Sequence, residues 1–238
     1  MSLPLYSVEF AATKKQLRLH YKDKKVVMIA SPGRSGSTLL TDCIERASGK
    51  YKVVKTHLLP PNKKYRGKIL FIFSNPDKAA ESALHMTLHD AGFAAEHFFH
   101  MGTAKRKWVK QINKGFQQTK GRNLLACDAL GCYPHLKKWL YTRTKASTPK
   151  KAQILAIKYE DLWKGSTIRA IRKFLRLRAF SLPPQKRRGY SGEDLLPQER
   201  LFREAYNVGS SEQPIYSAYD KARRIWKDAP PYQFLKIK

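Results

Sequence analysis

Acidic residues are scarce in this chain of 238 residues, which has 47 Lys and Arg but only 18 Asp and Glu. The formal net charge of +29 creates a positive field that concentrates anions near the surface. This field favours an anionic ligand or partner but does not select one, because nucleic acid, acidic glycans, phospholipids and phosphorylated nucleotides are all attracted.

Cysteine is also rare. Cys43, Cys127 and Cys132 are odd in number and match no metal or disulfide framework, which is typical of a reducing compartment. The sequence lacks a run of about 18 apolar residues that could span a bilayer, and its first ten residues lack the order of a signal peptide. We therefore expect a cytoplasmic protein without a transmembrane segment.

Two further kinds of site are disfavoured. The basic stretches at 105–122 and 164–178 come without a helix-turn-helix, zinc-finger or ribonucleoprotein signature, which argues against nucleic acid as the partner. The histidines His85, His89, His97 and His100 lack Cys, Asp or Glu at metal-ligating spacing, so we expect no metal site.

Apolar residues make up 42% of the chain and charged residues 27%, with no internal repeat or low-complexity linker, so a single domain over 1–238 is expected. Short apolar runs predict buried strands at 26–30, 53–54, 69–73 and 154–158. Apolar residues at helical spacing predict helices at 37–47, 78–89 and 167–178. This alternation predicts an α/β fold of three layers, with a central parallel sheet of about four to five strands between helices. Regular patterns fade after Pro183-Pro184, which predicts a partly irregular C-terminal cover over 183–238.

The loop at 31–38, Ser-Pro-Gly-Arg-Ser-Gly-Ser-Thr, stands between the first of these strands and the helix that follows. Free backbone N–H groups and the helix dipole favour a phosphate at this position. The two glycines allow close backbone approach, Ser37 and Thr38 offer hydroxyl donors, and Arg34 adds a positive fork. The alternative is a Ser/Gly turn that only caps the helix.

Comparison with a nucleotide triphosphatase P-loop shows two departures. Ser31 stands where the first glycine would be, and Ser37 stands where the lysine that bridges the β- and γ-phosphates would be. A P-loop-like kinase or nucleotide hydrolase is therefore the second enzyme hypothesis. A nucleotide with one transferable group beyond its first phosphate suits the loop better than a triphosphate.

The run Arg34-Ser35-Gly36-Ser37-Thr38-Leu39 resembles the 5′-phosphosulfate loop of the sulfotransferase family, whose fold is P-loop-like. The resemblance implies 3′-phosphoadenosine 5′-phosphosulfate (PAPS) as co-substrate. Residues 34–38 would hold its 5′-phosphosulfate, and Arg34 would neutralise the bridging oxygen as the sulfuryl group leaves.

Further stretches resemble the family in the same order. Lys55-Thr56-His57-Leu58 is similar to its catalytic motif, which implies His57 as the base and places Lys55 near the acceptor and the leaving sulfuryl group. A neutral histidine is chemically suited to take a hydroxyl proton near pH 7, although a structural histidine at a strand end would leave the same pattern.

The stretch 74–82 resembles the element that binds the 3′-phosphate of the nucleotide, and it implies Ser82 as a ligand. Ser74 departs from the family, which has arginine there, and a serine cannot supply the charge of that fork. This departure favours the non-enzyme hypothesis of a basic polyanion-binding protein with a degenerate nucleotide pocket.

The stretch 187–193 is similar to a second 3′-phosphate loop and implies Arg187, Arg188 and Gly189 as ligands, with a solvated basic loop as the alternative. The stretch Tyr159-Glu160-Asp161-Leu162 is similar to a further motif of the family, and this resemblance implies that Tyr159 lies near the adenine. The four stretches at 31–38, 55–58, 74–82 and 159–162 follow predicted strands, whose carboxyl ends form the ligand-binding edge of a parallel sheet. The leading hypothesis is transfer of a sulfuryl group from PAPS to a hydroxyl or amine of an unknown, possibly anionic acceptor, with no metal required.

Overall fold

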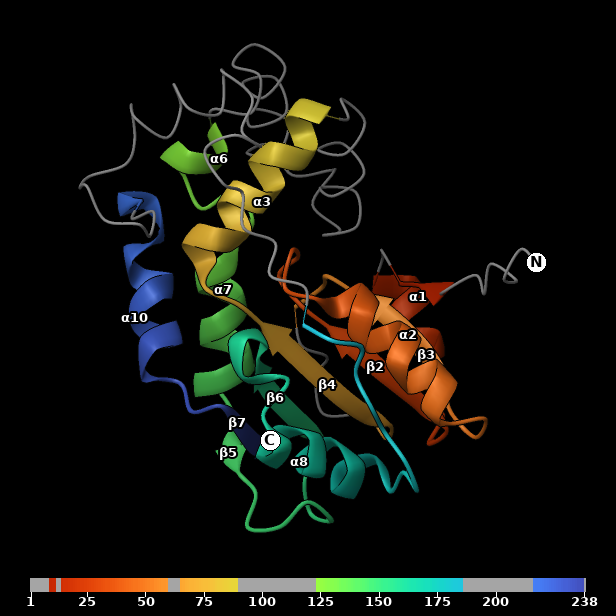
Figure 1. The fold of residues 1–238 in the computed structure, drawn as a ribbon. Helices are drawn as coiled ribbons and strands as arrows, with labels where there is room; N and C mark the ends of the chain where they lie inside the picture. Colours follow the sequence, from red (N-terminus) through yellow and green to blue (C-terminus); the bar gives the residue numbers. More distant parts are fainter. Residues whose placement is uncertain (1–8, 12–13, 60–64, 90–122, 186–215, 238) are drawn as a thin grey trace.

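The computed structural model describes residues 9–11, 14–59, 65–89, 123–185 and 216–237 (Figure 1). Within these ranges a sheet of seven strands has the order β1-β3-β2-β4-β6-β7-β5. The strands are β1 (Glu9–Phe10), β2 (Val26–Ala30), β3 (Lys52–Thr56), β4 (Lys68–Phe73), β5 (Thr144–Lys145), β6 (Ile154–Lys158) and β7 (Tyr232–Lys236). The helices are α1 (Lys14–Leu19), α2 (Ser37–Ala47), α3 (Pro76–His89), α6 (Asn123–Ala126), α7 (Cys132–Leu136), α8 (Gly165–Leu175) and α10 (Asp220–Asp228). The short π-helix η1 (Lys137–Tyr141) continues α7, and the 3₁₀ turns η2 (Tyr159–Asp161) and η3 (Ser217–Tyr219) precede α8 and α10.

The four strands expected from the sequence are confirmed as β2, β3, β4 and β6, and they pair in parallel. The prediction of a parallel sheet with about four to five strands is wrong in both the number of strands and their direction. The sheet has seven strands and is mixed. β7 pairs antiparallel to β6, and β5 pairs antiparallel to β7. β1 and β5 have only two residues each, which is too short to leave a periodic pattern in the sequence.

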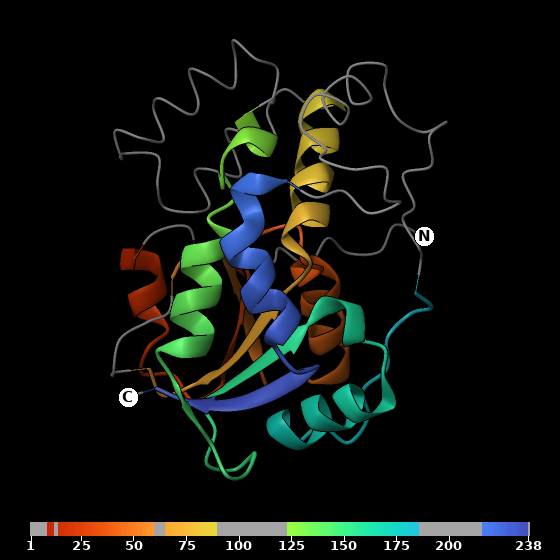
Figure 2. The same cartoon turned by 90° about the vertical axis from the view of Figure 1, so that its left-hand side faces the viewer.

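Helices cover both faces of the sheet (Figures 1 and 2). All five residues of β2 are buried, and they alternate between two apolar clusters. Val26 and Met28 belong to the cluster with α3, α7 and α10, whereas Val27 and Ile29 belong to the cluster with α2 and α8. A strand buried on both faces reads as a continuous apolar run, which is why the sequence predicted its bounds correctly.

The end of the chain is more regular than the sequence predicted. Residues 217–236 form η3, α10 and β7, and β7 is an internal strand of the sheet between β6 and β5. α10 has only Ala222 and Ile225 buried among nine mostly polar residues, so its apolar pattern is weak. No helix in the described ranges combines the length and the apolar character needed to cross a membrane.

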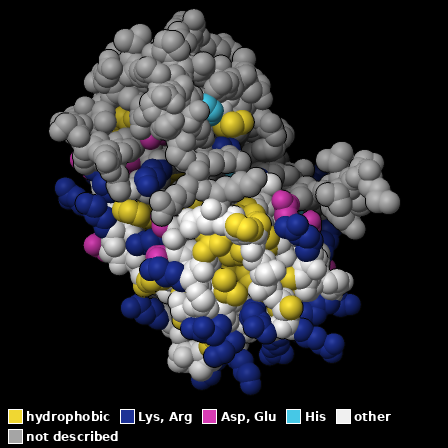
Figure 3. All heavy atoms as spheres, in the orientation of Figure 1, with side chains coloured by type: hydrophobic (Ala, Val, Ile, Leu, Met, Phe, Trp, Pro, Cys, Tyr) yellow, Lys and Arg dark blue, Asp and Glu magenta, His cyan; other side chains and the backbone are white. Residues whose placement is uncertain are grey.

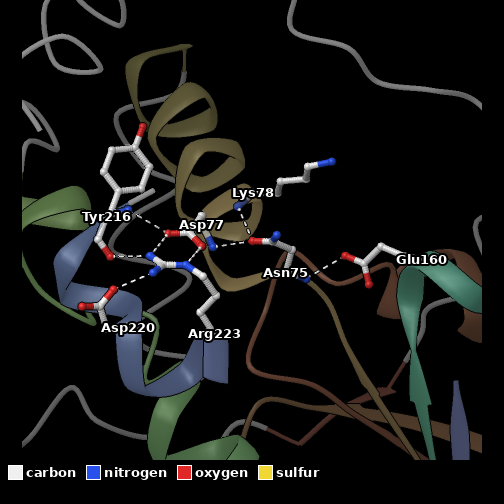
Figure 4. A network of polar contacts seen from close by, with 7 residues as sticks. All are labelled: Asn75, Asp77, Lys78, Glu160, Tyr216, Asp220 and Arg223. Atoms are coloured by element: carbon white, nitrogen blue, oxygen red, sulfur yellow. Dashed lines mark hydrogen bonds and ion pairs between the residues drawn. The ribbon is translucent and has the colours of Figure 1, made fainter. Parts of the chain in front are cut away.

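An ion pair between a partly buried arginine and a buried carboxylate joins α10 to the start of α3 (Figure 4). The carboxylate of Asp77 is 1% exposed and accepts hydrogen bonds from Arg223 Nε at 2.7 Å and Nη2 at 2.8 Å. The backbone N–H of Tyr216 donates to the same carboxylate at 2.9 Å. Removing one partner of a buried pair leaves an uncompensated charge that costs about 3–5 kcal/mol. The Asp77–Arg223 pair therefore holds residues 216–228 against α3.

His135 on α7 gives the fold a pH dependence. The residue is 3% exposed, and its Nδ1 has no hydrogen-bond partner among the described residues. Burial, and then the charge of Lys138, lowers the pKa of His135 from 6.5 to about 3. Between pH 6.5 and pH 3, His135 binds a proton in the unfolded chain but not in the folded one. Neutral His135 therefore contributes its full stabilisation above pH 6.5, and this stabilisation is lost as the pH falls towards 3.

We expect His135→Phe to remove this contribution to the pH dependence. Between pH 7.5 and pH 5 the wild-type free energy of unfolding should fall by about 2 kcal/mol more than that of the variant. Urea unfolding at a series of pH values measures the difference, and His135→Gln serves as a second variant that retains a polar side chain. Parallel pH profiles for wild type and both variants would contradict the assignment.

Candidate functional site

The loop between β2 and α2 has an unusual backbone. Gly33, Arg34 and Gly36 all have positive φ, at 103°, 49° and 75°. Such conformations turn successive N–H groups towards one side and form a concave site for an anion. Gly36 is also the N-cap residue of α2, a helix of eleven residues, and as a glycine it has no side chain to cap the first N–H groups. The loop and the helix end therefore offer backbone donors at the position where the sequence predicted a phosphate.

Buried serines support this loop from behind. Ser35 Oγ donates to the carbonyl oxygen of Gly33 at 2.9 Å and lies 3.0 Å from Ser74 Oγ. Because the proton of Ser35 is used by Gly33, the hydroxyl of Ser74 is the donor in the second contact. Ser74 is 8% exposed, so it braces the loop from the end of β4. The residue that departs from the family pattern thus has a structural partner in this chain.

Tyr159 covers the loop from the end of β6. Its ring lies so close to Gly36 that a Cβ atom on that glycine would overlap Cε2 and lie 2.5 Å from Cδ2. The same ring packs edge-on against Trp163, with 5.4 Å between the centroids. The sequence resemblance placed Tyr159 near an adenine, and the structure places its ring against the loop backbone. Gly36 is therefore required both for its left-handed conformation and for the absence of a side chain.

Arg34 connects the loop to α3. Its Nε and Nη2 both donate to Ser82 Oγ, at 3.0 Å and 2.9 Å. The two residues are 48 positions apart, and the sequence assigned them to opposite ends of one nucleotide. This contact brings a permanent positive charge to the side of α3 that faces the loop.

A second cation approaches the start of α2 from β3. Lys55 Nζ donates to Thr38 Oγ1 at 2.7 Å. Thr38 is exposed and Lys55 is half-buried, so the ammonium group lies at the surface of the loop. Arg34 and Lys55 therefore place two positive charges beside the backbone donors.

His57 lies directly after β3 and is 5% exposed. Its Nδ1 lies 2.9 Å from the carbonyl oxygen of Ser31 and 3.1 Å from Ser31 Oγ. Because a carbonyl can only accept, Nδ1 carries the proton, and Nε2 of the neutral ring is the basic nitrogen. The strand end thus fixes the tautomer that a general base requires.

Glu160 is a residue whose bridging position the sequence did not reveal. Its Oε1 accepts from the backbone N–H of Asn75 at 2.7 Å, and its Oε2 accepts from Trp226 Nε1 at 3.2 Å. It therefore links the end of β6 to the start of α3, as Figure 4 shows, and through Trp226 also to α10. The charge of Lys158 lies over the Trp226 ring, with 5.0 Å to its centroid. These contacts fix the elements that carry the site.

The structure thus brings most of the expected site residues together near the carboxyl edge of the sheet, in β3, in α2 and α3, and in the segments that follow β2, β3 and β6. They are Arg34, Ser35, Gly36, Ser37, Thr38, Lys55, His57, Ser82 and Tyr159. The other three, Arg187, Arg188 and Gly189, lie outside the described residues, as do His97 and His100. Among the described residues, no three His, Cys, Asp or Glu side chains are grouped so that they could hold a metal ion.

Comparison with known proteins gives no assignment. No family model matches the chain, and the searches of curated proteins and of solved structures also returned no match. The residues and contacts at the carboxyl edge are therefore the basis for a functional proposal.

The contact between Gly36 and Tyr159 can be tested by a double-mutant cycle. We expect Gly36→Ala to lower the free energy of unfolding by about 3 kcal/mol or more, because it adds both overlap and backbone strain. In the Tyr159→Ala background, Gly36→Ala should cost only the backbone strain of about 1 kcal/mol, because the overlap is gone. The loss of stability in the double variant should therefore be smaller than the sum of the losses in the two single variants.

Gly49→Ala is the matched control, since a Cβ there would meet nothing within 4 Å. Its effect on urea unfolding should be within about 0.5 kcal/mol. Strict additivity of Gly36→Ala and Tyr159→Ala would show that ring and loop are not in contact.

Proposed function

We propose that this chain is a sulfotransferase that binds PAPS at the carboxyl edge of the sheet and transfers its sulfuryl group to a hydroxyl or amine. The observation that carries the proposal is the pair of hydrogen bonds from Arg34 to Ser82, at 3.0 Å and 2.9 Å. These hydrogen bonds join Arg34, in the loop that the resemblance implies for the 5′-phosphosulfate, to Ser82, the residue that it implies for the 3′-phosphate. A P-loop-like binding architecture is part of the same proposal.

The loop after β2 is suited to the 5′ end of the nucleotide. Its left-handed residues and the start of α2 after Gly36 supply backbone donors, while Ser37 and Thr38 add hydroxyl groups. Arg34 and Lys55 would balance the negative charge that develops on the bridging oxygen as the bond to sulfur breaks. Ser35 has its hydroxyl turned to Gly33, so it would contribute its backbone N–H.

His57 would act on the acceptor. With Nδ1 held by the carbonyl of Ser31, its Nε2 is the nitrogen that can take the proton from an attacking hydroxyl. Arg34, Lys55 and His57 come from two adjacent strands, so donor and acceptor would meet at one rigid edge. Holding the reacting groups in line supplies much of the rate in such displacements.

Ser74 supports a second hypothesis. It lies behind the loop and bonds to Ser35, so it supplies no charge for a 3′-phosphate. A protein with this site could bind a nucleotide without a 3′-phosphate, or it could retain the pocket without catalysis. Binding of a bisphosphate nucleotide separates the first of these from the sulfotransferase hypothesis, and turnover of PAPS separates the second.

We expect 3′-phosphoadenosine 5′-phosphate to bind the purified chain with micromolar affinity in calorimetric titration, and ATP with Mg²⁺ to bind much more weakly. Arg34→Ala should weaken the bisphosphate at least tenfold, because it removes a charge-assisted contact. Arg46→Ala is the matched control, since Arg46 is an exposed arginine of α2 whose loss changes the net charge equally. Absence of bisphosphate binding, or equal losses in the two variants, would overturn the proposal.

His57 should be required for turnover and not for nucleotide binding. We expect His57→Gln to lower kcat by about 10²–10⁴ and to leave the affinity for the bisphosphate unchanged. Transfer from PAPS to a panel of phenol, alcohol and amine acceptors measures kcat, and titration measures affinity. A variant that retains full turnover would exclude His57 as the base, whereas loss of binding and turnover together would assign it a structural role.

A further inference from the structure

The amino edge of the sheet lies opposite the candidate site, and several turns meet there. The start of β3 is tied to the end of α8 by Tyr51 OH, which donates to the carbonyl oxygen of Leu175 at 2.9 Å. The backbone N–H of Lys52 donates to the carbonyl oxygen of Lys25 at 3.0 Å, and Ile69 donates in the same way to Gln153 at 2.9 Å. Residues 22–25, 50–52, 66–68, 143–153 and 172–178 thus form one surface, which we call the amino-edge surface.

This surface is almost purely basic. Asp23 is the one carboxylate in its five segments. The cations are Lys22, Lys24, Lys25, Lys50, Lys52, Arg66, Lys68, Arg143, Lys145, Lys150, Lys151, Arg172, Lys173, Arg176 and Arg178, and all but Lys68 and Arg143 are exposed. Figure 3 shows Lys and Arg side chains gathered along the lower part of the molecule with no acidic side chain visible among them.

Several of these cations are held in place by backbone carbonyl groups. Lys50 Nζ donates to the carbonyl oxygen of Arg176 at 3.0 Å, and Lys68 Nζ donates to that of Ala152 at 2.6 Å. Arg172 Nη2 donates to the carbonyl oxygen of Arg178 at 2.7 Å. Burial, and then the charge of Arg176, lowers the pKa of Lys68. A neutral acceptor leaves the positive charge uncompensated, so the surface retains its attraction for anions.

Exposed apolar side chains border the same surface. Leu19 is 73% exposed and ends α1 three residues before Lys22. Tyr141 is 60% exposed and ends η1 two residues before Arg143. In the described part of the chain, Leu19 and Tyr141 are the large hydrophobic residues whose side chains are exposed. Apolar and aromatic side chains beside clustered cations are typical of proteins that rest on a membrane interface.

We propose that the amino-edge surface, with Leu19 and Tyr141 at its border, docks onto a bilayer that contains anionic lipids. Four of the segments enter β3, β2, β4, β6 and β5, which occupy six adjacent positions of the sheet when β7 between β6 and β5 is included. At a strand spacing of about 4.8 Å the surface extends over about 24 Å, which suits a flat partner. Single-stranded nucleic acid would require several exposed aromatic rings for stacking, and among the described residues Tyr141 is the one large aromatic side chain that is exposed. An acidic polysaccharide would use the cations but would leave Leu19 without a partner.

The orientation has a functional consequence. With the amino edge on the bilayer, the carboxyl edge that carries Arg34, Lys55 and His57 faces away from the lipid. The candidate site would remain open to soluble ligands while the chain is bound. The docking proposal does not depend on which reaction the site performs.

The test is cosedimentation of the full chain with vesicles of phosphatidylcholine alone and with vesicles that also contain phosphatidylserine. We expect partition into the anionic vesicles only, with a steep decrease as salt is added. Lys150→Gln with Lys151→Gln should lower the partition coefficient about tenfold or more, because each cation near the lipid contributes to the attraction. Arg224→Gln with Lys227→Gln on α10 removes the same charge elsewhere and should have a much smaller effect.

Leu19→Ser with Tyr141→Ser tests the apolar contribution without changing the charge. This variant should bind anionic vesicles several-fold more weakly and should bind heparin and a DNA duplex as the wild type does. Circular dichroism melting of each variant verifies that it is folded. Equal losses in the two charge variants, an unchanged Leu19 and Tyr141 variant, or binding to heparin or DNA without binding to vesicles would overturn the proposal.

Discussion

The buried strand β2 is the constraint on which the site depends. It pairs with β3 on one side and β4 on the other, and helices cover both of its faces. The chain can leave such a strand only at its end, where the next residues must turn sharply into α2. Three positive φ angles produce this turn, and neighbouring side chains hold it: Ser74 from β4, His57 from β3 and Tyr159 from β6. A site for an anion and the packing of the central sheet thus use the same contacts.

The sequence predicted those parts of the fold in which one physical requirement dominates the residue choice. A strand buried on both faces must be apolar throughout, so β2 and β6 were found with their correct bounds. β7 lies at the transition to the antiparallel part of the sheet, and of its residues only Leu235 is buried. The sequence of β7 therefore has no clear apolar pattern, and its position in the sheet depends on pairing with β6 and β5, which are distant in the chain. The antiparallel end of the sheet could not be derived from local pattern for this reason.

The candidate site shows the same division. Glycines at positive φ and a loop between strand and helix leave a recognisable pattern, so residues 33–38 could be placed from the sequence. The contacts that orient them could not be placed, because Arg34 with Ser82 and Ser31 with His57 join residues far apart in the chain. Ser74 is the most instructive case. In the sequence it is notable only because the family that the chain resembles has arginine at this position. In the structure it is a hydroxyl donor that holds the loop.

The position of β7 in the sheet also bears on how the chain is made. β5 contains residues 144–145, yet its pairing is with β7 at residues 232–236, and β6 likewise has β7 along one edge. During synthesis at about 5–20 residues per second, β6 presents that edge unpaired for several seconds before β7 is available. An edge of buried apolar residues is prone to pair with other chains in that interval. The dense positive charge of this protein, which keeps like chains apart, would be protective before the fold is complete.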